Sequence, residues 1–134
     1  MKFSLIIYET PEAFATRHDP AHAAGYWAAW PAYTAALIEA GVLAGGAGLE
    51  GPDTAATIRF GAGGPQLGGQ PVQGHQVQDG PFADTKEQLG GIYIIDVPDF
   101  DAAMKWAARM PLTLGGAVEV RPNLDMEQRQ AALG

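Results

Sequence analysis

Hydrophobic and polar positions follow strand spacing in some parts of the chain and helical spacing in others. Apolar and β-branched runs bounded by glycine, proline or aspartate predict strands. These segments are residues 3–8, 42–49, 54–60, 75–78, 92–97 and 118–121. Apolar residues at three- and four-residue steps predict two helices, over 20–40 and 99–110. Pro31 lies inside the first helix and removes a backbone donor, so we expect a kink there or two shorter helices.

Capping residues indicate where the two helices begin and end. Asp19 followed by Pro20 is a typical N-cap and first helical residue, and Gly41 supplies the stop. Asp99 precedes the second helix as its N-cap, and Pro111 ends it. A short helix after Pro122 has little apolar sequence to support it.

The order of these elements predicts an α+β fold. One strand and a helix are followed by four strands, a second helix and a last strand. Both helices can cover one face of a mostly antiparallel sheet, as in the ferredoxin-like split βαβ arrangement with an inserted hairpin. Two helices cannot cover both faces, and alternation in the strands is too weak for a polar face. We therefore expect one domain over residues 1–134 that forms a homodimer through its sheets.

One segment has no periodicity of either kind. Residues 61–74 (GAGGPQLGGQPVQG) are rich in glycine, proline and glutamine. We expect a flexible loop here, and the alternative is a lid over a nearby site, because long loops in small domains are often functional.

The net charge and the composition of the chain bear on which partners it can bind and on its location in the cell. The net charge is −7, and the eight lysines and arginines are scattered along the chain. Nucleic acid and anionic membranes bind clustered basic surfaces, so neither is an expected partner. The chain has no cysteine and no apolar run of membrane-spanning length, which favours a cytoplasmic location.

No cofactor is expected from the motifs. Residues 46–51 match G-x-G-x-x-G by letter, but Pro52 and another predicted strand follow instead of the helix that a dinucleotide site requires. His18 and His22 are four residues apart, which suits a metal ion only when both lie on one face of a helix. The predicted helix begins at Pro20, so His18 precedes it and the two do not share a face. We expect no metal site.

The segment at residues 79–95 (DGPFADTKEQLGGIYII) closely resembles the signature of the DGPF branch of the YCII-related family. The resemblance covers most of the chain. It includes residues 2–8 (KFSLIIY), 37–43 (LIEAGVL), 57–59 (TIR), 97–103 (VPDFDAA) and 118–122 (VEVRP). It implies a ferredoxin-like dimeric α/β barrel. It implies little about activity: most members are uncharacterised, a few relatives look like enzymes that use a His and an Asp, and some are encoded beside sigma factors.

The DGPF segment has a structural and a functional interpretation. In the structural one, Asp79, Gly80 and Pro81 form a turn and Phe82 fills the core. Asp84 then caps a single helical turn over residues 85–88. In the functional one, Asp79 is a general base at the mouth of a pocket. The residues that would bind substrate beside it are Gly80, Pro81, Phe82, Lys86 and Glu87.

Two further groups can belong to such a site. His22 falls in the first helical turn, where the helix dipole favours the neutral imidazole, so it is a candidate base as well as an ordinary surface histidine. His75 leads into the DGPF strand, and the same two interpretations apply. Tyr26 belongs to an aromatic set that forms core, dimer contact or the wall of a pocket.

Two functions remain open from the sequence. The first is a cofactor-free lyase, isomerase or hydrolase in which Asp79 and His22 exchange a proton with a small organic metabolite. The second is a non-catalytic ligand-binding or regulatory homodimer. A pocket shared by Asp79 and a histidine would favour the first, and a solvated Asp79 would favour the second.

Overall fold

The computed structural model describes residues 1–60 and 76–133. Its elements in chain order are β1 (Lys2–Glu9), α1 (Pro11–Thr16), α2 (Ala23–Glu39), β2 (Leu43–Gly48), the short 3₁₀ turn η1 (Pro52–Thr54), β3 (Ala56–Arg59), β4 (Gln76–Asp79), β5 (Gln88–Asp96), α3 (Phe100–Ala107), β6 (Ala117–Pro122) and α4 (Met126–Leu133). The described residues form a mixed structure of helices and antiparallel strands, which agrees with the predicted α+β class. The expected flexible loop at 61–74 and His75 lie outside the described residues.

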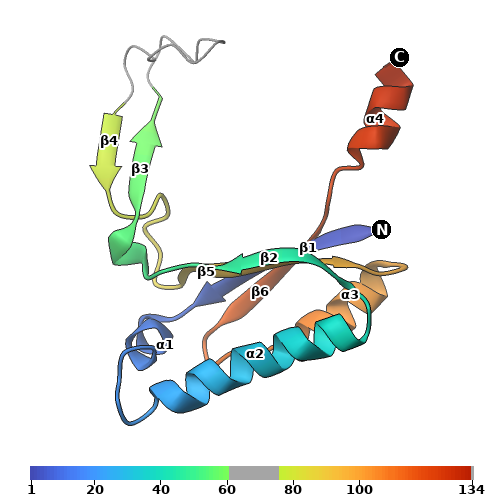
Figure 1. Cartoon of the computed structure of the whole chain (residues 1–134). Helices are drawn as coiled ribbons and strands as arrows, with labels where there is room; N and C mark the ends of the chain where they lie inside the picture. Colours follow the sequence, from blue (N-terminus) through green and yellow to red (C-terminus); the bar gives the residue numbers. More distant parts are fainter. Residues whose placement is uncertain (61–75, 134) are drawn as a thin grey trace.

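The strands form two antiparallel sheets. The larger has the order β2-β5-β1-β6, so the two central strands come from opposite ends of the chain. The smaller contains β3 and β4 alone and projects from the larger sheet as a separate hairpin (Figure 1). The larger sheet is open within the described residues, with β2 and β6 at its edges, so a single chain does not close the expected barrel.

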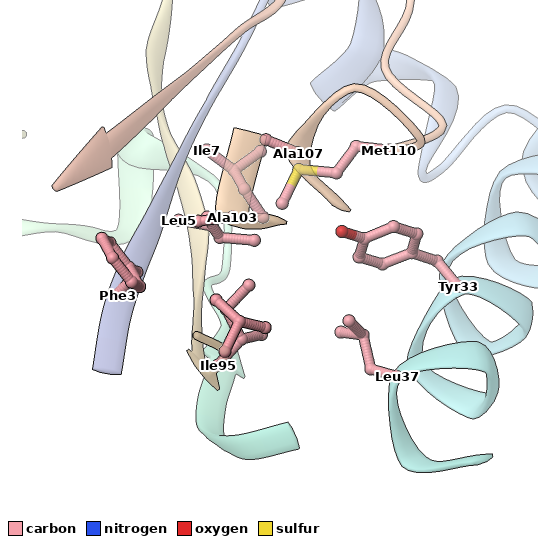
Figure 2. Close-up of a cluster of buried hydrophobic side chains, with 10 residues drawn as sticks. Phe3, Leu5, Ile7, Tyr33, Leu37, Ile95, Ala103, Ala107 and Met110 are labelled. Carbon is pink, nitrogen blue, oxygen red and sulfur yellow. The ribbon is translucent and has the colours of Figure 1, made fainter. Parts of the chain in front are cut away.

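The core lies between the larger sheet and the helices. Alternate residues of β1 point toward α2 and α3, and Phe3, Leu5 and Ile7 are at most 3% exposed. They meet Ile95 of β5 and Leu37 of α2, as Figure 2 shows. This alternation along a central strand is what one face buried against helices requires.

Helices α1, α2 and α3 lie on one side of the larger sheet, whereas the hairpin and α4 extend on the other (Figure 1). The register places Ile6 of β1 between Ile92 of β5 and Glu119 of β6, on the face that the helices leave open. Tyr8 and Leu89 are paired on this same face. The uncovered face is therefore largely apolar along β1 and β5.

Helix α1 was not predicted, although the sequence contains its cap. Thr10 and Pro11 follow the predicted strand at residues 3–8, and a proline there also fits the end of a strand. In the structure the Thr10 hydroxyl accepts a hydrogen bond from the Ala13 N–H at 3.2 Å, and Pro11 is the first helical residue.

Helix α2 begins later than predicted because Asp19 caps a turn instead of the helix. Its carboxylate accepts from the Ala21 N–H at 3.0 Å and contacts His22 Nδ1 at 2.7 Å. The helix starts at Ala23 with His22 as N-cap. It then continues through Pro31 to Glu39 as one helix, so the alternative of two shorter helices is wrong.

Helix α3 has the cap that the sequence predicts. The Asp99 carboxylate accepts from the Ala102 N–H at 2.8 Å. The helix ends at Ala107, three residues before the predicted end, and Met110 still packs into the core from the following turn. The predicted strands at 42–49 and 54–60 are both present in shortened form, and they belong to different sheets.

Across the described residues, no helix has the length and apolar character that crossing a membrane requires.

Burial predicts a large difference between two neighbouring positions of α2. Leu37 is 0% exposed and Ile38 is 61% exposed. We expect Leu37→Ala to lower the free energy of unfolding by about 2–5 kcal/mol because it removes core contacts and leaves a cavity. Ile38→Ala is the matched control and should cost less than about 1 kcal/mol. Urea denaturation measures both, and equal losses would contradict the placement of α2.

Candidate functional site

A cavity of about 620 Å³ opens between the first half of α2 and strands β2 and β5. Its wall on the helix side carries the aromatic side chains of Tyr26, Trp27 and Trp30. Its wall on the sheet side combines the side chains of Ile7, Leu43 and Tyr93 with glycine backbone, from residues 45, 46 and 48 of β2 and residues 90 and 91 of β5. This volume is within the range of small-molecule sites.

A buried ion pair forms one end of the cavity. Glu9 is the last residue of β1, and its carboxylate accepts from an Arg17 N–H at 2.9 Å. The two side chains are 4% and 7% exposed. The Tyr26 hydroxyl donates to the same carboxylate, at 2.8 and 2.9 Å from its two oxygens, and accepts from Arg17 Nε at 3.0 Å. We call Glu9, Arg17 and Tyr26 the polar triad.

Arg17 connects the polar triad to the two strands beside it. Its guanidinium also donates to the carbonyl oxygens of Leu49 and, at 3.4 Å, of Gly90. Its carbon lies 4.7 Å from the ring centre of Phe14 and 5.8 Å from that of Trp27, which adds cation–π attraction. Burial alone lowers the pKa of Arg17, but the hydrogen bonds with Tyr26 and Glu9 outweigh burial and raise it. The guanidinium is therefore a fixed positive charge.

Tyr26 is held in its neutral form. Burial, and then the hydrogen bond to the Glu9 carboxylate, raise the pKa of its hydroxyl to about 12. A phenolate here would stand beside an anion, which explains the direction of the shift. Tyr26 is thus a hydrogen-bond donor to Glu9 at neutral pH.

The glycines of the sheet wall provide the open space. An added Cβ at Gly90 would collide with the Glu9 carboxylate, so only glycine lets Glu9 occupy this position. A Cβ at Gly46 would lie 2.6 Å from the Ile92 carbonyl oxygen, and its φ of +153° also favours glycine. A Cβ at Gly48 would meet nothing within 4 Å. Gly48 pairs with Gly91, whose Cβ would point toward Ile7 and the helix side, so Gly48 faces the cavity.

Aromatic and hydroxyl groups form the other end of the cavity. The rings of Trp30 and Tyr93 are stacked at 19° with their centres 6.5 Å apart. The hydroxyls of Tyr93 and Thr34 are 2.6 Å apart, and Thr34 also donates to the Trp30 carbonyl at 3.0 Å. This end of the cavity is apolar apart from one hydroxyl pair.

Of the residues predicted for the site, the structure places Tyr26 in the cavity wall. His22 is far more exposed, with 71% of its side chain accessible, and its imidazole contacts Asp19. That hydrogen bond holds the pKa of the Asp19 carboxyl below its usual range. His22 and Tyr26 therefore do not share the cavity.

Residues 79–87 of the DGPF segment lie at the base of the projecting hairpin and are absent from the cavity lining, whereas Gly90, Gly91 and Tyr93 near its other end line the cavity. Asp79 is exposed and pairs with Ala56 at the end of β4. Gly80, with φ of +98°, makes the turn and donates its N–H to the Ala55 carbonyl at 2.7 Å. Pro81 and Lys86 are exposed, and Glu87 is partly exposed.

Two structural expectations for this segment are wrong. Phe82 does not fill the core: it is 70% exposed, and its ring centre lies 5.0 Å from the Arg59 guanidinium carbon. Asp84 does not cap a helical turn, because no helix forms at 85–88 and β5 begins at Gln88. The Gln88 side chain instead bonds the carbonyls of Ala83 and Thr85 and holds the bend.

Sequence reasoning missed Glu9 and Arg17. Phe3, Leu5 and Ile7 alternate along β1, and Glu9 is the next residue in this alternation. The two-residue period of a strand therefore predicts that Glu9 lies on the buried face. A carboxylate on a buried face requires a partner, and Arg17 is the first arginine after it in the chain. Among the described residues, no three His, Asp or Glu side chains are grouped so that they hold a metal ion.

The chain belongs to the YCII-related domain family, whose family model matches residues 1–127. It is similar to an uncharacterized protein of Rhizobium meliloti (strain 1021), with 42% identity over 89 residues. The match covers 63% of this chain and 62% of that relative, so the chain spans less than two thirds of the relative's length.

The polar triad predicts a large cost for removing its anion. Glu9→Gln keeps the side-chain shape but leaves the buried Arg17 without a counter-charge, and we expect the free energy of unfolding to fall by about 3–5 kcal/mol. Glu12→Gln is the matched control, because Glu12 is exposed on α1 and the same change there should cost less than about 1 kcal/mol. Urea denaturation at pH 7 distinguishes them. A loss for Glu9→Gln no larger than that of the control would mean that Arg17 is solvated.

The raised tyrosine pKa values predict a loss of stability at high pH. Burial raises the pKa of both Tyr26 and Tyr33 from 10.0 to about 12. The folded protein thus holds these protons where the unfolded chain releases them, so stability is full below pH 10 and falls as pH rises from 10 to 12. Ultraviolet titration of the wild type should show tyrosines that ionise only well above pH 10. Their number should be smaller in Tyr26→Phe. Complete ionisation of all tyrosines by pH 10.5 would contradict this.

Proposed function

We propose that this protein binds a small organic molecule in the cavity between α2 and the β2–β5 edge, without acid–base catalysis by Asp79 and His22. The observation that carries the proposal is the combination of an open glycine wall with a rigid polar triad at one end. Such a cavity is preformed, so a ligand is not required to order it.

The positions of the predicted acid–base pair support the non-catalytic alternative. Asp79 is exposed on β4, and His22 is exposed before α2. The one carboxylate fixed at the inner end of the cavity, that of Glu9, already accepts from Arg17 and Tyr26. These hydrogen bonds use the Glu9 carboxylate to hold Arg17 and Tyr26 in place. Binding is therefore the function that these groups support best.

We further propose that the protein is a ferredoxin-like protomer of the DGPF branch and forms a dimeric α/β barrel. The support is the sheet face opposite the helices, where Ile6, Tyr8, Ile92 and Ile94 are only partly buried. Among the described residues no helix packs over this face (Figure 1). A second copy that packs sheet against sheet would cover both apolar faces at once.

Filling the cavity tests the binding function. Gly48→Leu adds a side chain that meets no protein atom at its Cβ and projects into the open space. Gly25→Leu is the matched control, since Gly25 is exposed on α2 and its Cβ also meets nothing within 4 Å. In a thermal-shift screen of metabolites, a ligand should raise the Tm of the wild type and of Gly25→Leu but not of Gly48→Leu.

The screen contradicts the binding function if every compound that stabilises the wild type stabilises Gly48→Leu equally. A screen in which no compound raises the Tm of the wild type contradicts it as well.

Charge on the open sheet face tests the dimer. The chain has a mass of 14.0 kDa, and we expect sedimentation equilibrium to give twice that value for the wild type. Ile6→Glu would place charges in the middle of the interface and should yield monomers. Ile38→Glu, at a position 61% exposed on α2, should remain dimeric. A monomeric wild type at micromolar concentration would overturn the proposal.

A further inference from the structure

We propose that the ligand of the cavity is a flat, uncharged aromatic ring that carries a hydroxyl or amino group. This inference rests on the proposed binding function and adds the chemical class of the ligand. Shape, charge and hydrogen-bonding capacity of the cavity each support it.

The shape of the cavity favours a flat ring. On the sheet side, Gly46, Gly48 and Gly91 expose bare backbone, so a flat ring can lie close to this part of the wall. The indole of Trp30 and the ring of Tyr93 both line the cavity and are nearly parallel, at 19° to each other. Aromatic rings gain most from such surfaces by stacking.

The charges around the cavity disfavour an anion. Among the described residues, Arg17 is the only lysine or arginine that lines the cavity, and four of its five N–H groups already donate to Glu9, Tyr26, Leu49 and Gly90. The carboxylates of Glu9 and Glu50 also line the cavity, and the chain carries a net charge of −7. An anionic group would therefore be repelled without gaining a free cation.

The same arrangement disfavours a cation. The carboxylate of Glu9 is already paired with Arg17. Arg17 also lies over the rings of Tyr26 and Trp27, two of the aromatic groups in the cavity wall. A second cation beside it would meet a fixed positive charge, so an uncharged ligand fits best.

Hydrogen-bonding capacity favours a ligand with a donor. Tyr26 donates to Glu9, and the Trp27 indole donates to the Arg17 carbonyl at 3.1 Å. Thr34 donates to the Trp30 carbonyl, which leaves the Tyr93 hydroxyl to donate to Thr34. All of these donors already bond to acceptors within the protein, whereas the Tyr93 and Glu9 oxygens have lone pairs left that can accept a hydrogen bond from a ligand.

A hydroxyl group on the ligand supplies the donor that the Tyr93 or Glu9 oxygen can accept, and both of these residues line the cavity. An ether or a bare hydrocarbon supplies fewer of these bonds.

Five probes on one carbon skeleton test the ligand class. The probes are 2-naphthol, 2-methoxynaphthalene without the donor, 2-naphthoate as the anion, protonated 2-(aminomethyl)naphthalene as the cation, and decahydro-2-naphthol without the flat ring. Isothermal titration calorimetry of the wild-type protein at pH 7 should show 2-naphthol binding at least ~10-fold more tightly than each of the other four, the effect of about one net hydrogen bond. Gly48→Leu should weaken 2-naphthol binding at least ~10-fold, and Gly25→Leu should leave it unchanged.

The ligand class is overturned if any of the other four probes binds as tightly as 2-naphthol, or if 2-naphthol does not bind. Binding of 2-naphthol that is equal in the wild type and in Gly48→Leu also overturns it, because the ring then lies elsewhere. Failure of the class is distinguishable from failure of the cavity. A non-aromatic or charged metabolite whose thermal shift disappears in Gly48→Leu would refute the class and support the binding function.

Discussion

The buried contact between Glu9, Arg17 and Tyr26 is the interaction on which the cavity depends. Taking a carboxylate and a guanidinium out of water is costly unless each finds its partners, so the segments that carry them must meet in one arrangement. Through Arg17, the end of β1 and the turn after α1 are bonded to α2, to the Leu49 carbonyl beyond β2 and to the Gly90 carbonyl of β5. The distance between α2 and the sheet edge is thereby set by charge pairing as well as by apolar packing.

This arrangement also explains the concentration of glycine at one corner of the sheet. The buried carboxylate of Glu9 needs the space that a side chain on Gly90 would fill, and the neighbouring strand approaches Gly91 closely. At these positions glycine is required by the polar triad and by strand packing. At Gly48 it is required by neither, because a Cβ there meets nothing. Neither the polar triad nor strand packing therefore requires the empty volume beside Gly48.

The alternation of apolar and polar residues in the strands and the capping residues of the helices predicted most of the fold. A strand that is buried on one face needs an apolar residue at every second position, and this pattern is visible in the sequence. Phe3, Leu5 and Ile7 on β1, and Asp99 before α3, are examples. The candidate site was harder to predict. Asp79 and His22 were chosen for their chemistry, and chemistry alone does not say which side chains the topology brings together. Arg17 and Tyr26 lie nine residues apart across a change of helix, and no local pattern reports their contact.

The aromatic wall has a spectroscopic consequence. Two of the three tryptophans, Trp27 and Trp30, line the cavity, whereas Trp106 lies on α3 with the Arg109 guanidinium 4.3 Å from its ring. Indole emission depends on the polarity of its surroundings, so the intrinsic fluorescence of the protein combines emission from the two indoles of the cavity with emission from Trp106, which does not line it. With Trp106 replaced by phenylalanine, the remaining emission would report, without any label, when the cavity exchanges water for another occupant.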